Sequence, residues 1–178
     1  MSIDAFLYFP KQAKRQIRGE TMDSDFGGKG AFELTDFSFG AENSLQMGSF
    51  SDGAGGGKTD FEPFSVSKRA DTATCPLFHT LCVGQHIPEA ILELRRSGGS
   101  DRKSGSTFLK IHFLTVVVKS IKWAGDDESV KEDIEFESGA MKIEYFRQDK
   151  TGKLKKADGD AGEAKWSRML NDEVYRVA

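Results

Sequence analysis

The sequence predicts a mainly β protein with a single domain over residues 1–178. We expect an antiparallel β-barrel or two packed sheets, with one short α-helix and an extended glycine-rich loop. Apolar and polar residues alternate in several segments, as in a strand with one buried face, whereas only one segment has helical spacing. The chain also contains 19 Gly but only 4 Pro, which favours turns, bulges and one long loop over a disordered tail.

Three strands are expected in the N-terminal half. In residues 3–9 every second residue is apolar, so one face of this strand should be buried. Residues 32–39 change the phase of their apolar positions near Asp36, which indicates a β-bulge. Residues 61–68 contain Pro63, so this strand should begin at a sheet edge or a bulge.

One helix is expected between the third and fourth strands. Thr74 can cap its N-terminus and Gly84 can end it. Its expected apolar stripe consists of Leu77, Phe78, Leu81 and Cys82.

In the C-terminal half, alternation of apolar and polar residues predicts further strands at residues 90–96, 108–123 and 130–146, and a short strand is expected around Trp166. Residues 108–123 are too long for a flat strand, so we expect this strand to bend, with the side chains of Leu109, Ile111, Phe113, Val117, Ile121 and Trp123 on one face. In residues 130–146 the apolar positions change phase at Gly139.

Composition excludes several classes of protein. Lys and Arg number 25 against 28 Asp and Glu, a net charge of −3 that argues against a nucleic-acid binder. No apolar run approaches the roughly 20 residues that cross a bilayer, so no membrane insertion is expected. The N-terminus has its apolar residues before its basic ones, the reverse of a secretory signal. Two cysteines cannot form a disulfide scaffold, so we expect synthesis in a reducing cytosol and no export by the general route.

The glycine-rich loop ends in Gly57, Lys58 and Thr59, which invites comparison with a phosphate-binding loop. That motif requires Gly at position 52, where this chain has Asp52. No nucleotide site is therefore expected.

The helix and its end carry Cys75, His79, Cys82 and His86, a spacing that could bring zinc ligands to one side. However, both cysteines flank the apolar stripe, where free Cys acts as a small hydrophobe. The segment ADGDAGE (residues 157–163) resembles the start of a calcium loop, but Met169 stands where that loop requires Glu. We expect no metal and no cofactor.

No catalytic constellation is apparent in the sequence. His112 alternates into a sheet face without a nearby nucleophile, and the sequence has neither GxSxG nor HExxH. An enzyme is not expected.

Five short motifs and a late Trp occur in a characteristic order along the sequence. They are DAFLYF (residues 4–9), GET (19–21), FELTDFSFGA (32–41), FSVSK (64–68), GQHIPEAILELRRSGG (84–99) and a late Trp166. Together they resemble the haemolysin-coregulated protein (Hcp) family, the inner-tube subunit of bacterial type VI secretion, over nearly the whole chain.

The resemblance implies a homohexameric ring of β-barrel subunits around a wide pore. Rings would stack into a tube inside a contractile sheath on a baseplate, with a VgrG-like spike protein at the tip. The tube would carry or chaperone effectors in its lumen. The subunit would occupy the bacterial cytoplasm before firing and be secreted to the medium or a target cell without a cleavable signal peptide. Since the chain ends at Ala178, no fused effector is expected.

The resemblance also implies two candidate sites. Ser38 matches a small residue that faces the pore in relatives, although an ordinary sheet-face serine is an equal alternative. The second site is the glycine-rich loop, which would stack against the next ring, with simple disorder as the alternative; its residues are Ser49, Phe50, Ser51, Asp52, Gly53, Ala54, Gly55, Gly56, Gly57 and Lys58. The alternative function is a phage-tail-tube-like protein or a β-barrel adaptor that binds partners at a sheet edge.

Overall fold

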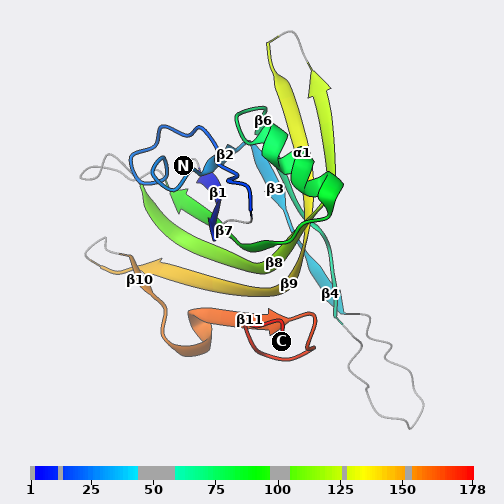
Figure 1. Cartoon of the computed structure of the whole chain (residues 1–178). Coiled ribbons are helices and arrows are strands. Elements are labelled where there is room, and N and C mark those ends of the chain that lie inside the picture. The colour runs from blue at the N-terminus through cyan, green and yellow to red at the C-terminus, as the bar shows by residue number, and fades with distance from the viewer. Residues whose placement is uncertain (1–2, 12–13, 44–58, 97–104, 126–127, 151–153) are drawn as a thin grey trace.

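The computed structural model describes residues 3–11, 14–43, 59–96, 105–125, 128–150 and 154–178. The described residues form strands, one α-helix and one short 3-10 helix, so the mainly β prediction is confirmed (Figure 1). The elements are β1 (Ile3–Lys11), β2 (Phe32–Leu34), β3 (Asp36–Ser38), β4 (Ala41–Asn43), β5 (Thr59–Phe61), β6 (Phe64–Arg69), α1 (Thr74–Val83), β7 (Ile87–Arg96), β8 (Ser106–Gly125), β9 (Val130–Gln148), β10 (Leu154–Lys156), η1 (Gly159–Ala161) and β11 (Glu163–Ser167).

The main sheet has the order β2-β1-β7-β8-β9-β6-β3, with β10 and β11 also paired to β9, and all its pairs are antiparallel. Its two ends, β2 and β3, are consecutive in the chain. The N–H of Thr35, between them, donates to the carbonyl of Ser67 in β6 at 2.9 Å. Because one segment pairs with β1 and then with β6, the sheet is a nearly closed barrel. The phase change near Asp36 is thus a change of partner strand, and the predicted bulge was wrong.

Phenylalanine rings fill the barrel. Phe64 stacks on Phe113 with ring centroids 4.4 Å apart, and Phe9 meets Phe136 edge-on at 6.2 Å. All four side chains are at least 96% buried. Such rings supply large apolar area without a polar group that needs a partner, which suits a closed interior.

The expectation that β1 buries only one face was wrong. Phe6 and Tyr8, on the other face, are also buried, in a second cluster with Phe26, Ala31 and Ile91. Phe6 and Phe26 stack with centroids 4.1 Å apart. The connection before β2 folds back over the outer face of β1 and covers it, which strand alternation alone cannot reveal.

The single helix is confirmed, with two corrections. Thr74 does not cap it: Ala73 occupies the N-cap position, and the Thr74 hydroxyl instead accepts the N–H of Asp71 at 3.1 Å. Gly84 ends the helix with φ +65°, as predicted. Of the expected stripe Leu77 is fully buried, whereas Phe78 is 48% exposed and Cys82 is exposed. Leu77 joins the barrel core and Leu81 packs against it, so two of the four residues of the expected stripe face the barrel.

The two longest strands bend together (Figure 1). Buried positions in β8 shift from Ile111 and Phe113 to Val116 and Val118, across Thr115 at φ +53°. Opposite Thr115 in the register lies Gly139, where the apolar phase of β9 also changes, as predicted. Beyond the bend Val117 lies on the face opposite the buried Val116 and Val118, so the single face expected for this strand does not continue across Thr115. Trp123, near the end of the strand, is 44% exposed.

Candidate interaction surfaces

Small hydroxyl side chains line one outer face of the barrel. In one row across β3, β6, β9 and β8 lie Ser38, Ser65, Glu135 and Ser120, and in the next row lie Asp36, Ser67, Asp133 and Lys122. We call these eight residues the serine ladder. They line a shallow groove of about 190 Å³. Ser38 therefore lies on a continuous polar sheet face rather than at an isolated surface position.

The ladder follows from alternation along each strand. Val66 and Ile134 point the other way and are 98% buried in the barrel core. On the polar side the Ser67 hydroxyl donates to Asp133 Oδ1 at 2.5 Å, and this hydrogen bond lowers the pKa of Asp133. The surface that results is hydroxyl-rich and charged, with no large apolar side chain in its two rows.

The other predicted site, residues 49–58, lies outside the described residues. The strands that flank it are described: β4 and β5 pair as a small two-stranded sheet that extends away from the barrel (Figure 1).

The four-stranded sheet that bears the ladder has two open edges. From residue 117 onward, β8 pairs only with β9 among the described residues, because β7 begins at Ile87 opposite Val116. At the far side, and again within the part of the chain that the structure describes, β3 pairs only with β6. Open strand edges present unpaired backbone groups that can bind another chain.

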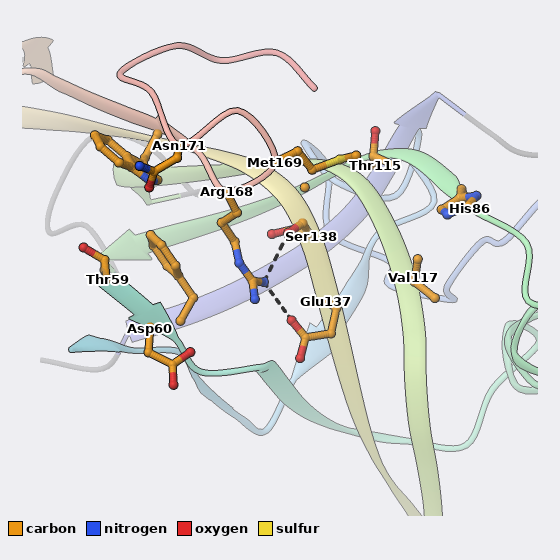
Figure 2. Close-up of a pocket in the computed structure, with 13 residues that line it drawn as sticks. Thr59, Asp60, His86, Thr115, Val117, Glu137, Ser138, Arg168, Met169 and Asn171 are labelled. Atoms are coloured by element: carbon orange, nitrogen blue, oxygen red, sulfur yellow. Dashed lines mark hydrogen bonds and ion pairs between the residues drawn. The ribbon is translucent and has the colours of Figure 1, made fainter. Parts of the chain in front are cut away.

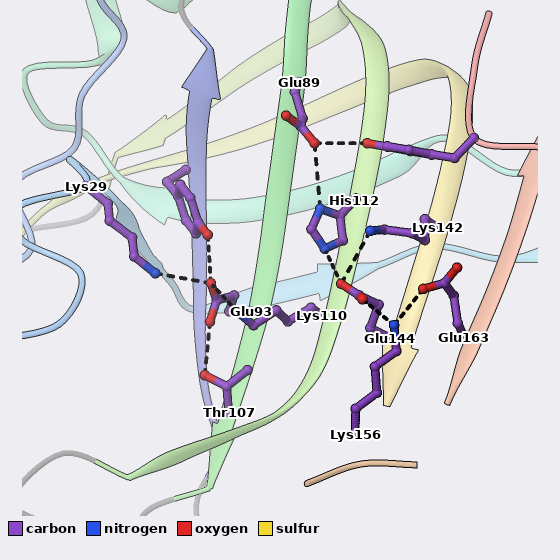
Figure 3. A network of polar contacts seen from close by, with 12 residues as sticks. Lys29, Glu89, Glu93, Thr107, Lys110, His112, Lys142, Glu144, Lys156 and Glu163 are labelled. Carbon is purple, nitrogen blue, oxygen red and sulfur yellow. Dashed lines mark hydrogen bonds and ion pairs between the residues drawn. The ribbon is translucent and has the colours of Figure 1, made fainter. Parts of the chain in front are cut away.

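A second outer face carries a polar network built around two glutamates (Figure 3). Glu93 is 98% buried and accepts hydrogen bonds from Tyr8 at 2.7 Å, Thr107 at 3.0 Å and Lys29 at 3.2 Å. Burial opposes ionisation of Glu93, but Tyr8 and the cations of Lys110 and Lys29 outweigh it and lower its pKa. Burial and the bond to Glu93 raise the pKa of Tyr8.

The second glutamate of this network is Glu144. His112 Nε2 lies 2.7 Å from its carboxylate and Lys156 Nζ also 2.7 Å. Burial alone would raise the pKa of Glu144, but these two bonds outweigh it and lower the pKa to about 2. His112 Nδ1 lies 3.6 Å from Glu89, which accepts the hydroxyl of Tyr175 at 3.1 Å. The network thus ties the C-terminal segment to β7, β8 and β9, a role the sequence did not reveal.

A groove of about 440 Å³ lies between β5, the bend of β8 and β9, and the turn after β11 (Figure 2). Arg168 reaches across it, donating to Glu137 Oε2 at 2.7 Å and to the carbonyl of Ser138 at 3.2 Å. Met169, 64% exposed, borders the same groove. This groove could not be predicted from the sequence, because its walls come from five separate segments of the chain, His86 among them.

The suggested zinc ligands do not converge. Among the residues that the structure describes, no group of three His, Cys, Asp or Glu side chains could hold a metal ion. Cys75 and Cys82 are both exposed, so the expectation that they act as small core residues was wrong. In the same residues, no helix is long and apolar enough to cross a membrane.

A protein-family model described as "Type VI secretion system effector, Hcp" matches residues 6–145. A solved structure of a type six secretion system protein is 28% identical, covers 96% of this chain and 99% of its own, and superposes with a TM-score of 0.79. Hcp1 from Salmonella typhimurium is 23% identical, covers 98% and 100% of the two chains and gives 0.71. A type VI secretion system effector from Yersinia pestis is 18% identical, covers 92% and 98%, and gives 0.65. The Salmonella and Yersinia structures share the fold of this chain. No curated protein matches the chain.

Proposed function

Since this chain belongs to the Hcp family of type VI secretion system proteins, we propose that it is the repeating subunit of the secretion tube. Six copies form a ring, and rings stack into the inner tube of the apparatus. The family is one of structural tube proteins, so the chain acts by assembly and not by turnover.

One observation carries this proposal: among the described residues, the sheet that bears the serine ladder has no further strand paired at either edge. A contact between the β8 edge of one copy and the β3 edge of the next is head-to-tail, and such contacts close into a ring when their rotation divides the circle. In such a ring the ladders of neighbouring copies would line up as one polar surface.

We assign that surface to the lumen. Hydroxyl and charged groups hold water, so a passing protein would meet few apolar contacts that retain it. Ser38 would then contact effectors carried inside the tube, and residues 49–58 would contact the next ring. A spike protein at the tip, the sheath, the baseplate and the secreted effectors are the proposed partners. Release on sheath contraction would take the subunit from the cytoplasm to the medium or a target cell.

The solution mass tests the ring. Six chains of 19.7 kDa have a total mass of about 118 kDa, which multi-angle light scattering on a sizing column separates clearly from a monomer. Ring-shaped particles with a central hole in negative stain would complete the result. A monomer at millimolar concentration would overturn the preformed ring and favour an adaptor that binds partners at a sheet edge.

A further inference from the structure

The end of the chain forms a strap over the outer face of the barrel. We call residues 172–178 the C-terminal strap. Within the part of the chain that the structure describes, no backbone hydrogen bond of residues 173–178 reaches the barrel. Side chains hold the strap instead: the Tyr175 hydroxyl donates to Glu89 Oε1 at 3.1 Å, and Val177 packs against Gly139. The position of the strap therefore depends on a small number of side-chain contacts.

His112 lies between the acceptor of this hydrogen bond and a second carboxylate (Figure 3). Its Nδ1 is 3.6 Å from Glu89 Oε1, the same oxygen that accepts the Tyr175 hydroxyl, and its Nε2 is 2.7 Å from Glu144 Oε2. The Tyr175 ring meets the imidazole edge-on, with ring centroids 6.2 Å apart. The imidazole and both carboxylates are no more than 15% exposed, so water screens the charges of these three groups only weakly.

The charge of His112 decides whether both of its contacts are favourable. An imidazolium carries an N–H on each ring nitrogen, whereas a neutral imidazole carries one N–H and one lone pair. The closer carboxylate, Glu144, keeps the remaining N–H on Nε2, so loss of the other proton leaves a lone pair on Nδ1 that faces Glu89. The lone pair and the carboxylate repel, which displaces Glu89 from the position in which it accepts Tyr175. Lys11, 71% exposed and 3.7 Å from Glu89 Oε2, offers the displaced carboxylate another partner.

The other groups around the imidazole keep their charge while a histidine titrates. Two carboxylates, one ammonium and one phenol face the ring directly: Glu89 of β7, Glu144 and Lys142 of β9, and Tyr175 of the strap. One step further away are charged residues of four strands: Lys11 of β1, Lys110 of β8, Lys156 of β10, and Glu163 and Lys165 of β11. Glu144, with a pKa of about 2, stays ionised, and burial raises the pKa of Tyr175, so its hydroxyl remains a donor. Histidine is the residue type here that ordinarily changes charge between about pH 5 and pH 8.

We propose that His112 is a pH-sensitive latch for the C-terminal strap. The protonated ring holds Glu89 in place and the strap lies on the barrel, whereas loss of the proton displaces Glu89 and frees Tyr175. Release of the strap uncovers the outer face of the barrel at Gly139, beside the bend of β8 and β9. All the groups of the latch belong to one copy of the chain, so the latch does not depend on the proposed tube function.

A spin label on the strap tests the latch. The label is attached at Arg176→Cys, an exposed position beside Tyr175, in a chain whose two exposed native cysteines are replaced by Cys75→Ser and Cys82→Ser. Electron paramagnetic resonance spectra then give the fraction of mobile label. We expect this fraction to rise at least about fivefold between about pH 5.5 and pH 8.5. Adding Tyr175→Phe should make the label mobile at both pH values, because the hydroxyl that holds the strap is absent.

Three further variants of the labelled chain identify the group that titrates. His112→Gln should abolish the response, because an amide carries no charge at either pH. The matched control, His86→Gln, changes an exposed histidine directly before β7 and should keep the full response. Glu89→Gln should keep the strap bound at both pH values, because its amide can donate to the neutral Nδ1 while its oxygen accepts Tyr175. Circular dichroism and light scattering check that each variant keeps its fold and its mass at both pH values.

Equal mobility of the label at the two pH values in the parent chain would overturn the latch. A full response in His112→Gln, or its loss in folded His86→Gln, would also overturn it and assign the response to another group. A mobile strap in folded Glu89→Gln at the higher pH, or an immobile one in Tyr175→Phe, would show that Glu89 and Tyr175 do not hold the strap in the way proposed. These outcomes are independent of the solution mass that tests the ring.

Discussion

Arg168, directly after β11, forms an ion pair with Glu137 of β9 in the gap between β6 and β11, which both pair with β9. Their Nη1 and Oε2 atoms lie 2.7 Å apart. On the side of β9 that faces away from β8, β6 begins opposite Phe136 and β11 ends opposite Ala140. No described strand pairs with residues 137–139 on this side. Arg168 fills that interval: its backbone N–H donates to the carbonyl of Gly139 at 2.9 Å while its side chain reaches Glu137.

Arg168→Ala should therefore loosen the C-terminal segment. We expect the free energy of unfolding to fall by about 1–2 kcal/mol, because the change removes charge-assisted hydrogen bonds that are partly shielded from water. Urea unfolding monitored by tryptophan fluorescence at constant protein concentration measures it. Lys165→Ala, which removes an exposed pair with Glu163 at 3.6 Å, is the control and should change stability by less than about 0.5 kcal/mol. Equal losses in the two variants would contradict the role of Arg168.

The bend of β8 stores strain at Thr115. A β-branched residue at φ +53° is unfavourable, whereas Asn tolerates this left-handed conformation. Thr115→Asn should raise the free energy of unfolding by about 0.5–1 kcal/mol. Thr107→Asn in the same strand should lower it, because Thr107 is in regular strand and donates to Glu93 at 3.0 Å. A loss of stability in Thr115→Asn would show that its side chain contributes more than the backbone strain costs.

Most strands could be predicted from the sequence because their alternation is a local property. Pro63 lies directly before β6, where a missing backbone N–H costs no ladder hydrogen bond. Gly84 ends α1 because glycine adopts a positive φ without steric cost. The change of partner at Thr35 could not be predicted, since it depends on where two distant strands lie. The burial of Phe6 was not predicted for a similar reason: the segment that covers it is a connection without a periodic pattern.

The candidate surfaces were less predictable than the strands. Ser38 was predicted only from its position in a motif that resembles the family, FELTDFSFGA. The residues beside it in the serine ladder depend on the register of β3 with β6 and of β6 with β9. Sequence alone does not show the register between strands that lie far apart in the chain. The bonds from Tyr8 and Lys29 to Glu93 arise in the same way.

The buried pair of Lys68 and Glu132 should be strongly coupled. Both side chains are 99% buried, and their charged atoms lie 2.5 Å apart. Lys68→Met should cost about 3–5 kcal/mol, because it leaves Glu132 buried without its cation. Adding Glu132→Gln should recover about half of this loss, since Gln keeps an acceptor for the Trp123 indole N–H. Urea unfolding of the two single variants and the double variant completes the cycle, and additive losses would show that the pair is not coupled.

Acid should destabilise the fold through Glu144. Its pKa falls from an ordinary 4.5 to about 2 in the folded chain, so its contribution is fully present above pH 4.5 and is lost as the pH falls towards 2. The lowered pKa values of Glu93 and Asp23 act in the same direction. Glu144→Gln should be less stable than the wild type at pH 7 and nearly equal to it at pH 2.

Urea titrations at pH 7, 4.5 and 2 measure this convergence. Glu173→Gln, an exposed glutamate near the C-terminus, should follow the wild type at every pH. A constant gap between Glu144→Gln and the wild type across the range would mean that the carboxylate shape, and not its charge, supports the network.

Ser38→Gln separates assembly from transport. Ser38 is exposed, and its backbone pairs with Ser65 in a register that a longer side chain does not disturb, so we expect the ring mass to stay at about 118 kDa. In the proposed lumen, however, a glutamine at each of six equivalent positions narrows the pore and displaces ordered water, so effector recovered in the culture medium should fall at least about tenfold. Ser24→Gln, an exposed serine in the connection before β2, is the control and should leave secretion unchanged. Normal effector release by assembled Ser38→Gln rings would place the ladder away from the lumen, whereas loss of the ring itself would place Ser38 in a contact between subunits.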